Sequence, residues 1–315
     1  MKRAAEAIGL FGPESEAWRF DREAMLILGI GPRALLLQLA DPGVAAGVEE
    51  HSDFRDDPWR RLDGTLRSYE RIIYGSTSAA RGEIRRLNAL HRGIRGAGYS
   101  ARDPVLALWV HATLIDSTIV GNDAWLGPLP RARAARFYEE TLPIARAFGV
   151  PDRLLPPDID AFDAYVAERL APGGGVRVSD TARELAVTVL NPPLPGVLGR
   201  LPVDARAYAW TLWPAVGLLP PTIREQYGLR WGVRERLVAD WLVAGWRLWN
   251  PRLPAAFRQM PQALAADRRI RSVVLGEARR EEPREVDGGP VVERLEQRPR
   301  ADDPVAMVGD VLPQR

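Results

Sequence analysis

Apolar residues recur with a helical period along most of this chain, and capping residues mark where the helices begin and end. Asp57-Pro58 is typical of an N-cap followed by proline at the first helical position, and Gly75 follows the helix that this pair opens. Asp103-Pro104 opens another helix, predicted over 105–120 and ended by Gly121. No convincing alternation of apolar and polar residues indicates a strand. The sequence therefore predicts a mainly α protein, a single orthogonal domain of about ten helices.

The same signals place the remaining helices. One helix, capped by Ser76 or Ser78, is predicted to run through His91 to Arg95 and to end at Gly96. From Glu277 onward, acidic and basic residues alternate and prolines recur, so 277–315 is predicted to be a charged, disordered tail after a domain of residues 1–276. The other predicted helices, separated by loops rich in proline and glycine, are 131–148, 158–170, 179–190, 203–217, 221–227, 232–248 and 254–271.

Composition excludes several classes of protein. The chain has no cysteine, which rules out disulfides, iron–sulfur clusters and cysteine nucleophiles. The 43 basic and 41 acidic residues are interspersed, which argues against a nucleic-acid partner. No sustained apolar stretch follows Met1, so we expect a cytoplasmic protein. The apolar stretch 24–46 is interrupted by Pro32 and Pro42, which makes it a poor membrane span, although peripheral contact with a membrane stays open.

His91 is the first candidate ligand among only three histidines. On a helix it shares a side with Leu87, Leu90 and Ile94, and Arg95 lies one turn further on. A neutral imidazole is a good axial ligand for haem iron. The alternative, more frequent for a lone histidine, is a core residue bonded to a main-chain carbonyl.

Arg61 and Thr65 lie one turn apart on the helix predicted to start at Pro58, so they face the same way. An arginine with a hydroxyl one turn later can pair with a haem propionate and hydrogen-bond a bound oxygen species. The alternative is an exposed arginine on an arginine-rich helix, which is the more frequent arrangement.

His111 lies in a helix that is apolar on nearly all sides and therefore predicted to be buried. A buried imidazole needs a polar partner, and Asp116 and Thr113 are the nearest candidates along the helix. His111 is also the rival ligand for an iron. Packing in the core is the default interpretation.

Three weaker patterns have ordinary explanations. His51-Ser52-Asp53 cannot form a triad from adjacent residues, so we interpret it as a loop or cap. Gly29 to Ala34 matches G-x-G-x-x-A, but no series of strands and helices follows, so a helix break at Gly31-Pro32 is the favoured interpretation. Five tryptophans between 210 and 246 are candidates for the wall of an apolar cavity, with plain core packing as the alternative.

Several segments, taken in order, resemble a known family. It is the DUF2236 family, which includes the MpaB-type oxygenases and the catalytic domain of the latex-clearing rubber oxygenases, and the resemblance covers roughly residues 15–275. The segments are Ala34-Leu35-Leu36-Leu37-Gln38-Leu39-Ala40-Asp41-Pro42, Val44-Ala45-Ala46-Gly47-Val48, His51-Ser52-Asp53-Phe54, Arg61-x-x-x-Thr65, Tyr74-Gly75-Ser76, His91-Arg92-Gly93-Ile94-Arg95-Gly96, Tyr99-Ser100-Ala101-Arg102-Asp103-Pro104, Trp109-Val110-His111-Ala112-Thr113-Leu114 and Leu218-Leu219-Pro220 to Tyr227-Gly228-Leu229.

The resemblance implies a mainly α fold that encloses one b-type haem. In the rubber oxygenases, a histidine followed four residues later by arginine is the axial ligand, and this pattern matches His91 and Arg95 and so favours His91 over His111. The arginine and threonine required there match Arg61 and Thr65.

This chain departs from the family at two places. The lysine that caps the iron in the rubber oxygenases is replaced by Gly64, which argues against rubber as the substrate and implies a more open distal side. The family opening often has His-Pro where this chain has Asp41-Pro42, and nothing in the sequence explains that change.

The resemblance and the residues together predict a haem b-dependent oxygenase that uses O₂ on an apolar, isoprenoid- or lipid-like substrate, with oxidative cleavage of a carbon–carbon double bond as the family's chemistry. The alternative is a non-catalytic haem or lipid carrier, or a gas sensor, on the same fold. A helical binding protein that has lost haem is the third hypothesis.

Overall fold

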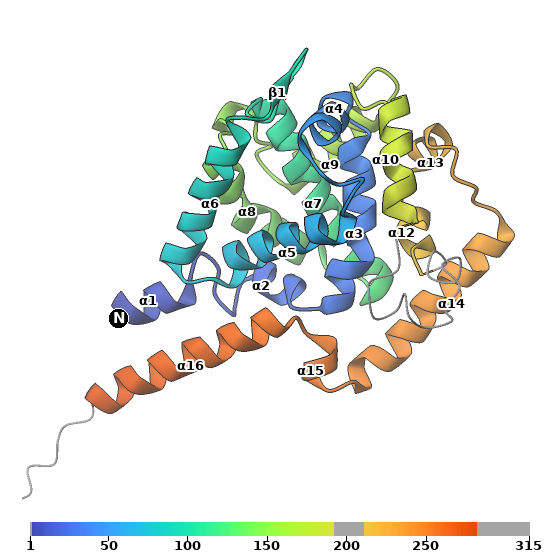
Figure 1. Cartoon of the computed structure of the whole chain (residues 1–315). Helices are drawn as coiled ribbons and strands as arrows, with labels where there is room; N and C mark the ends of the chain where they lie inside the picture. The colour runs from blue at the N-terminus through green and yellow to red at the C-terminus, as the bar shows by residue number, and fades with distance from the viewer. Residues whose placement is uncertain (1, 192–210, 282–315) are drawn as a thin grey trace, which may run out of the picture.

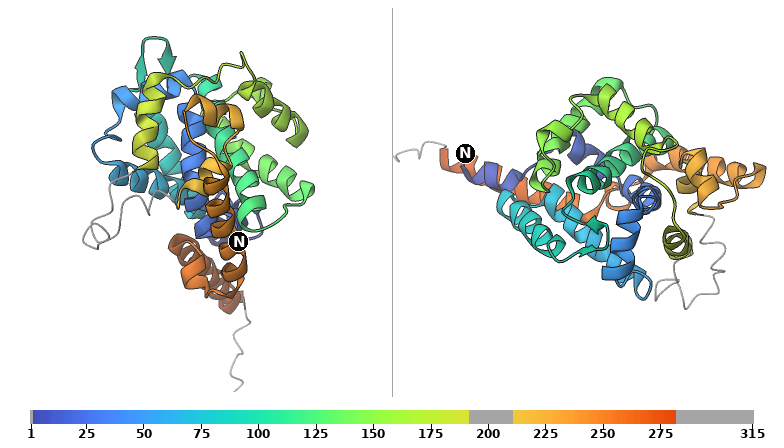
Figure 2. Two further views of the ribbon diagram at one scale, coloured as in Figure 1. Left: turned by 90° about the vertical axis from the view of Figure 1, so that its right-hand side faces the viewer. Right: turned by 90° about the horizontal axis from the view of Figure 1, so that it is seen from above.

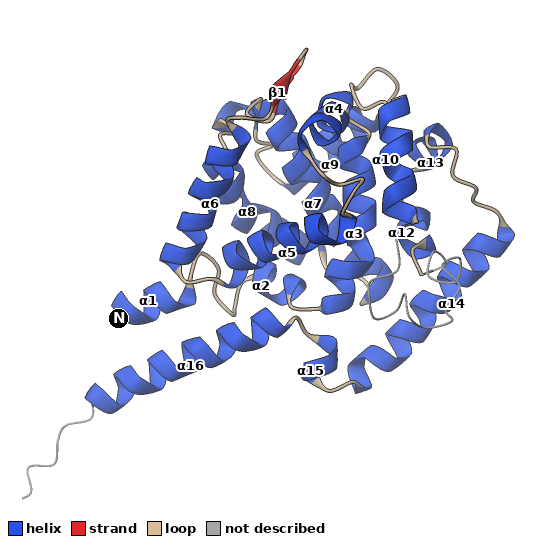
Figure 3. Cartoon of the chain, in the orientation of Figure 1, coloured by secondary structure: helices blue, strands red, loops and turns tan. Residues whose placement is uncertain are grey.

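The computed structural model describes residues 2–191 and 211–281, and most of them are helical (Figures 1 and 3). The mainly α fold predicted from the sequence is confirmed. Within this part of the chain, the only sheet is the antiparallel pair β1 (Arg95–Gly96) and β2 (Tyr99–Ser100). The helices are α1 (Lys2–Ile8), α2 (Glu16–Asp21), α3 (Ala24–Leu39), α4 (Pro42–His51), α5 (Pro58–Tyr74), α6 (Thr77–His91), α7 (Pro104–Trp125), α8 (Arg131–Ala147), η1 (Asp152–Leu154), α9 (Ile159–Leu170), α10 (Asp180–Leu190), α12 (Trp213–Gly217), α13 (Pro221–Gln226), α14 (Val233–Trp249), η3 (Asn250–Arg252), α15 (Ala255–Arg258) and α16 (Pro261–Glu281).

Local capping explains why α5 and α6 begin where they do. The side chain of Asp57 accepts a hydrogen bond from the main-chain N–H of Arg60 at 3.0 Å, and Pro58 occupies the first turn. Ser76 caps α6 by accepting from the N–H of Ala79 at 3.3 Å, which settles the choice between Ser76 and Ser78. The sequence thus predicts both starts correctly.

Helix α7 lies in the middle of the other helices and packs most extensively against α3 (Figure 1). Gly121 permits the closest approach, because a Cβ atom there would lie 2.1 Å from the Cγ2 atom of Ile30. The indole N–H of Trp109 donates to the carbonyl of Leu37 at 3.0 Å. This helix extends to Trp125, beyond the end predicted at Gly121, because the glycine serves helix packing there and not termination.

Two main apolar clusters share this central pair of helices. One gathers large aromatic side chains from α2, α8 and α9, among them Trp18, Phe137 and Phe162. The other joins α3 to α10, with Leu36 and Leu185 nearly or fully buried. Burial of this kind stabilises each large side chain by about 1.5–3 kcal/mol, so the two clusters hold the helices around α7 in place.

The region 24–46 forms two helices and not one. Helix α3 continues through Pro32, so the predicted break at Gly31-Pro32 is wrong. The carbonyl that loses its partner at Pro32 belongs to Leu28, which is exposed, so water can replace the missing N–H. Between α3 and α4 the chain bends by 103°, and among the helices of residues 2–191 and 211–281 only α7 is, by itself, long and apolar enough to cross a bilayer. The core helix of a folded domain can be equally long and apolar, and α7 packs among α3, α8 and α14 as such a helix does.

The C-terminal helices differ from the prediction. The segment 254–271 is interrupted after Arg258, because Gln259 bridges to Glu23 and Pro261 starts a new helix. Helix α16 then continues to Glu281, five residues into the segment predicted as a tail. Of the predicted helix 203–217, the structure shows the short α12, and 203–210 lies outside the described residues, as does 282–315.

Candidate functional site

The first turns of α5 bring Arg61 and Thr65 together. A guanidinium N–H of Arg61 donates to the hydroxyl of Thr65, and that hydroxyl donates to the main-chain carbonyl of Arg61 at 2.9 Å. Solvent reaches Arg61, yet burial lowers the pKa of its guanidinium. We call the partly exposed surface between this pair and the C-terminal end of the neighbouring helix α6 the recess.

His91, the last residue of α6, faces this recess from the neighbouring helix. Its pKa is lowered first by burial and then by the positive charge of Arg61, so the two side chains are near each other. The imidazole ring lies 6.1 Å from the ring of Phe148, centroid to centroid, and forms no hydrogen bond with the described residues. His91 is therefore held as a neutral imidazole whose nitrogen atoms are uncommitted.

Arg95 is not on the helix that carries His91, so the predicted continuation of α6 to Arg95 is wrong. Helix α6 ends at His91, and Arg95 pairs with Ser100 in the small hairpin, with an exposed side chain. Gly96 permits the ring of its strand partner Tyr99 to pack closely, since a Cβ atom there would lie 2.5 Å from that ring, and Gly98, with a φ of +81°, forms the turn. The recess thus receives Arg61, Thr65 and His91 from two helices, whereas Arg95 lies in a separate element.

Gly64 stands beside this pair on α5. A Cβ atom placed there would have no atom within 4 Å, apart from the neighbouring backbone of the helix. Position 64 is therefore exposed and has room for a side chain.

His111 occupies the middle of α7, where burial lowers the pKa of its imidazole to about 4. Its Nε2 atom is buried and has no hydrogen-bond partner within the described ranges. Neither expected partner reaches it, because Thr113 donates to Val110 and Asp116 pairs with Arg33 at 2.7 Å. An unpaired buried polar atom costs about 1–3 kcal/mol, so His111 is a second neutral imidazole, and its Nε2 atom has no partner among the described residues.

Both histidines fit an iron held by a single imidazole. Each ring is neutral near pH 7, and the guanidinium of Arg61 can pair with an anionic group such as a propionate. No three His, Asp or Glu side chains converge as a metal site anywhere in the described part of the chain. A haem iron needs only one imidazole from the protein, because the porphyrin supplies four of its ligands.

The other sequence candidates lie elsewhere. His51 ends α4 and its Nε2 atom lies 3.2 Å from the carbonyl oxygen of Arg95, while Asp53 pairs with Arg60, so the segment is a cap and loop as expected. Gly29 to Ala34 lies within α3, and no dinucleotide-binding turn forms.

The tryptophans of the C-terminal region do not wall one cavity. Trp241 is 74% exposed, whereas Trp246, on the same helix, packs against the core. The guanidinium of Arg224 lies over the ring of Trp231, 5.3 Å from its centroid. Trp210 lies outside the described residues. Trp241 and Trp246 therefore do not line the same surface, and a cavity wall that includes Trp241 is not formed by the described residues.

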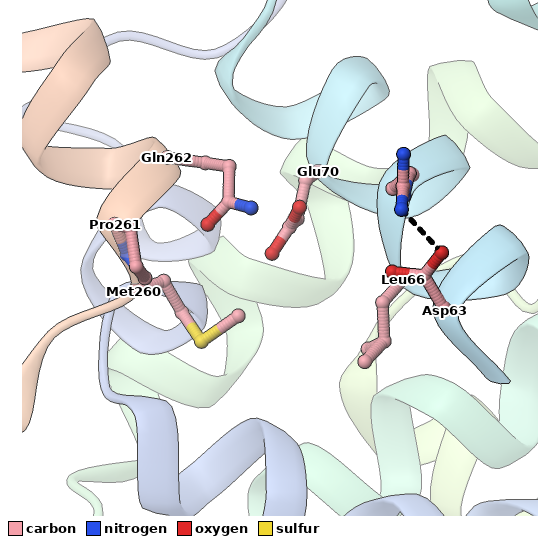
Figure 4. A pocket seen from close by; sticks show the side chains of 7 residues that line it. Asp63, Leu66, Glu70, Met260, Pro261 and Gln262 are labelled. Atoms are coloured by element: carbon pink, nitrogen blue, oxygen red, sulfur yellow. Dashed lines mark ion pairs between the residues drawn. The ribbon is translucent and has the colours of Figure 1, made fainter. Parts of the chain in front are cut away.

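A pocket of about 450 Å³ lies between α5 and the start of α16, and sequence reasoning misses it (Figure 4). Burial, and then the negative charge of Asp63, raise the pKa of Glu70 to about 7. No sequence signal indicates this site, because its two walls are far apart along the chain. The lining residues are Asp63, Leu66, Arg67, Glu70, Met260, Pro261 and Gln262.

Comparison with known proteins agrees with this architecture. Residues 18–248 match the family described as the catalytic domain of the ER-bound oxygenase mpaB/B′ and rubber oxygenase. Two similar relatives are the uncharacterized proteins Mb2261 of Mycobacterium bovis and Rv2237 of Mycobacterium tuberculosis, each 29% identical over 232 residues, which is 70% of this chain and 87% of the relative. No solved structure matches the chain. Because the match covers well over half of its length, the chain belongs to the mpaB and rubber oxygenase catalytic-domain family, a family of oxygenases.

Proposed function

We propose that this protein is a haem b-dependent oxygenase, located in the cytoplasm, that uses O₂ on an apolar substrate of isoprenoid or lipid type. The family supports the oxygenase class. The observation that carries the finer proposal is the recess in which Arg61, bonded to Thr65, approaches the neutral imidazole of His91.

His91 is the proposed iron ligand. Its pKa is lowered, so the ring keeps a free electron pair at neutral pH and needs no proton loss to bind a metal. Arg61 is proposed to bind a haem propionate or to line the distal side. Arg95 is proposed as a second cofactor-binding residue on the resemblance alone, because it lies exposed on the hairpin and outside the recess. His111 is the alternative ligand, because its Nε2 atom lacks a partner within the described ranges.

Haem bound at this site would supply an iron centre for the reaction of O₂ with a carbon–carbon double bond. The protein contributes position and polarity. Thr65 has one hydroxyl hydrogen, which now goes to the carbonyl of Arg61, and rotation of the hydroxyl would redirect it into the recess. The empty space at Gly64 leaves room for a substrate or for water beside this hydroxyl.

The absorption spectrum of protein purified from haem-replete cells tests the proposal. We expect a stoichiometric Soret band, with b-type α and β bands on reduction, and products from apolar alkenes in the presence of O₂. Haem without turnover would favour the carrier or gas-sensor alternative. Absence of a Soret band after haem reconstitution would refute haem dependence.

Replacement of the three histidines identifies the ligand. His91→Ala should remove haem, while His51→Ala should retain it, because His51 lies beside the carbonyl of Arg95 at an exposed position. Full haem content in His91→Ala together with loss in His111→Ala would transfer the ligand role to His111.

Thr65→Val keeps the side-chain shape and should shift the stretching frequency of carbon monoxide bound to the reduced protein. An unchanged frequency would exclude Thr65 from the distal side.

A further inference from the structure

Helix α14 has two apolar faces that point in nearly opposite directions. One face contains the buried Ala239 and the partly buried Trp246, which pack toward the core. The other face is exposed and repeats every three or four residues, so its members fall within roughly 80° of one another around the helix axis. We call it the α14 stripe, and it consists of Val233, Leu237, Trp241, Ala244 and Leu248.

The apolar side chains of the α14 stripe are more exposed and lie closer together than those on the surface of most soluble domains. Leu237 is 63% exposed and Trp241 is 74% exposed. Beyond the C-terminal end of the helix, Trp249 and Phe257 are exposed to 61% and 75%. Single exposed apolar residues need no explanation, but a contiguous patch marks an interaction site. The helix lies at the outer edge of the molecule, where a flat partner can approach it (Figures 1 and 2).

Positive charge surrounds the stripe. Residues 230–258 contain six arginines and two acidic residues, although the chain as a whole is nearly balanced. Of these arginines, Arg258 pairs with Glu23 at 3.8 Å. Arg247 donates to the main-chain carbonyls of Asp123 and Ala124, and Arg252 donates to the carbonyl of Leu248. Carbonyl partners hold these guanidinium groups in place without neutralising them, so their charge remains available to an anionic surface.

We propose that the α14 stripe docks on the surface of an anionic lipid membrane. An amphipathic helix with tryptophan and leucine on one side and arginine beside them lies in the plane of the interface, with its apolar side chains below the headgroups. Trp241 and Trp249 are suited to that depth, because an indole has an apolar body and a polar N–H.

A second copy of the chain fits this surface less well. Two stripes packed together would bring the flanking arginines of both copies side by side, and Glu235 and Asp240 are too few to compensate them. Glu235 is also committed to the helix start, where it accepts from the N–H of Gly232 at 2.8 Å. Anionic lipid headgroups attract the arginines beside the stripe, whereas the arginines of a second copy would repel them.

Flotation of the full chain with vesicles tests the proposal. Vesicles of phosphatidylglycerol and phosphatidylcholine in equal parts should bind the protein at least about tenfold more tightly than vesicles of phosphatidylcholine alone, since each arginine near the surface contributes about fivefold. Arg236→Gln removes one positive charge and should therefore weaken binding to the anionic vesicles about fivefold. Haem content does not enter this measurement, so its outcome is independent of the proposed oxygenase function.

Variants of the stripe locate the contact. Trp241→Glu and Leu237→Glu should each lower vesicle binding at least about tenfold, and their high exposure leaves the fold intact. Val187→Glu, on α10, is the matched control, because Val187 is 61% exposed but lies away from the stripe. Unchanged binding by Trp241→Glu, or no vesicle binding by the wild type, would overturn the proposal. The proposal would also be overturned if the wild type binds no vesicles but forms a concentration-dependent dimer in sedimentation velocity, and if Trp241→Glu dissociates that dimer.

Discussion

The centre of α7 and the recess between α5 and α6 both hold a neutral histidine, but in different surroundings. The pKa of His111 is lowered by burial alone, and its Nε2 atom is out of contact with water, whereas the pKa of His91 is lowered by burial and then by the positive charge of Arg61. Helix α7 is fixed on α3 by a buried arginine, while the start of α5 is largely exposed. The comparison teaches that the fold concentrates its stability at α7 and leaves the candidate site open to a ligand.

The largest effect should come from removal of the arginine that joins the two central helices. Arg33 donates to Ser117 at 2.6 Å and to the carbonyl of Leu218 at 2.9 Å, and it pairs with Asp116 at 2.7 Å. Arg33→Met leaves Asp116 without its counter-charge, so we expect a loss of about 3–5 kcal/mol in the free energy of unfolding, measured with urea.

Arg61→Met is the matched control for Arg33→Met. Solvent reaches Arg61, and among the described residues its guanidinium pairs with no carboxylate and bonds only to a hydroxyl on its own helix, so we expect a change within about 0.5 kcal/mol. A loss at Arg61 as large as that at Arg33 would contradict the distinction between a rigid centre and an open recess.

The pH dependence of stability should separate the two histidines. The pKa of His111 is lowered from 6.5 to about 4 in the folded protein, so the unfolded chain binds the proton first as the pH falls. The contribution of His111 is therefore fully present above pH 6.5 and is lost between pH 6.5 and 4, by about 3 kcal/mol in total. We expect the stability of wild type relative to His111→Leu to fall with acid by this amount.

His91→Leu provides the comparison for this titration. The pKa of His91 is lowered in the same direction, but solvent reaches the half-buried ring, so the corresponding loss should be smaller. Equal losses for the two histidines would show that His111 is as hydrated as His91. Unfolding measured at several pH values between 4 and 8 decides between these outcomes.

The sequence predicts local features of this molecule well. The bounds of α5 follow from Asp57, Pro58 and Gly75, which act within one turn, and the Arg61–Thr65 pair follows from helical spacing alone. The end of α6 is not predicted correctly, because it depends on a hairpin in which Tyr99 donates to Glu50 at 2.6 Å across 49 positions.

The partners of buried polar groups lie beyond sequence reasoning for the same reason. Asp116 is near His111 along the helix, but Arg33 from α3 takes its carboxylate. The pocket beside Glu70 likewise needs Met260, which folding alone brings to α5. Helical periodicity and capping residues indicate where helices begin and end, whereas the partner of Asp116 and the walls of this pocket depend on which helices pack together.

A pair of glycine replacements sharpens the comparison at smaller scale. In Gly121→Ala, the new methyl group would meet Ile30 at 2.1 Å, and Ile30 is itself buried between α3 and α7. Relief of this contact must move a packed side chain or separate the helices. We expect a loss of about 1–3 kcal/mol in the free energy of unfolding, because overpacking of a core costs this much.

Gly64→Ala should have the smallest effect and the opposite sign. The added methyl group meets no atom within 4 Å outside the helix backbone, and Gly64 lies in the interior of α5. Alanine is favoured over glycine at such a position by up to about 1 kcal/mol, so the variant should unfold at a higher urea concentration than the wild type. A loss of stability would mean that the recess beside Arg61 is closed in solution, and the open distal side would then have to be abandoned.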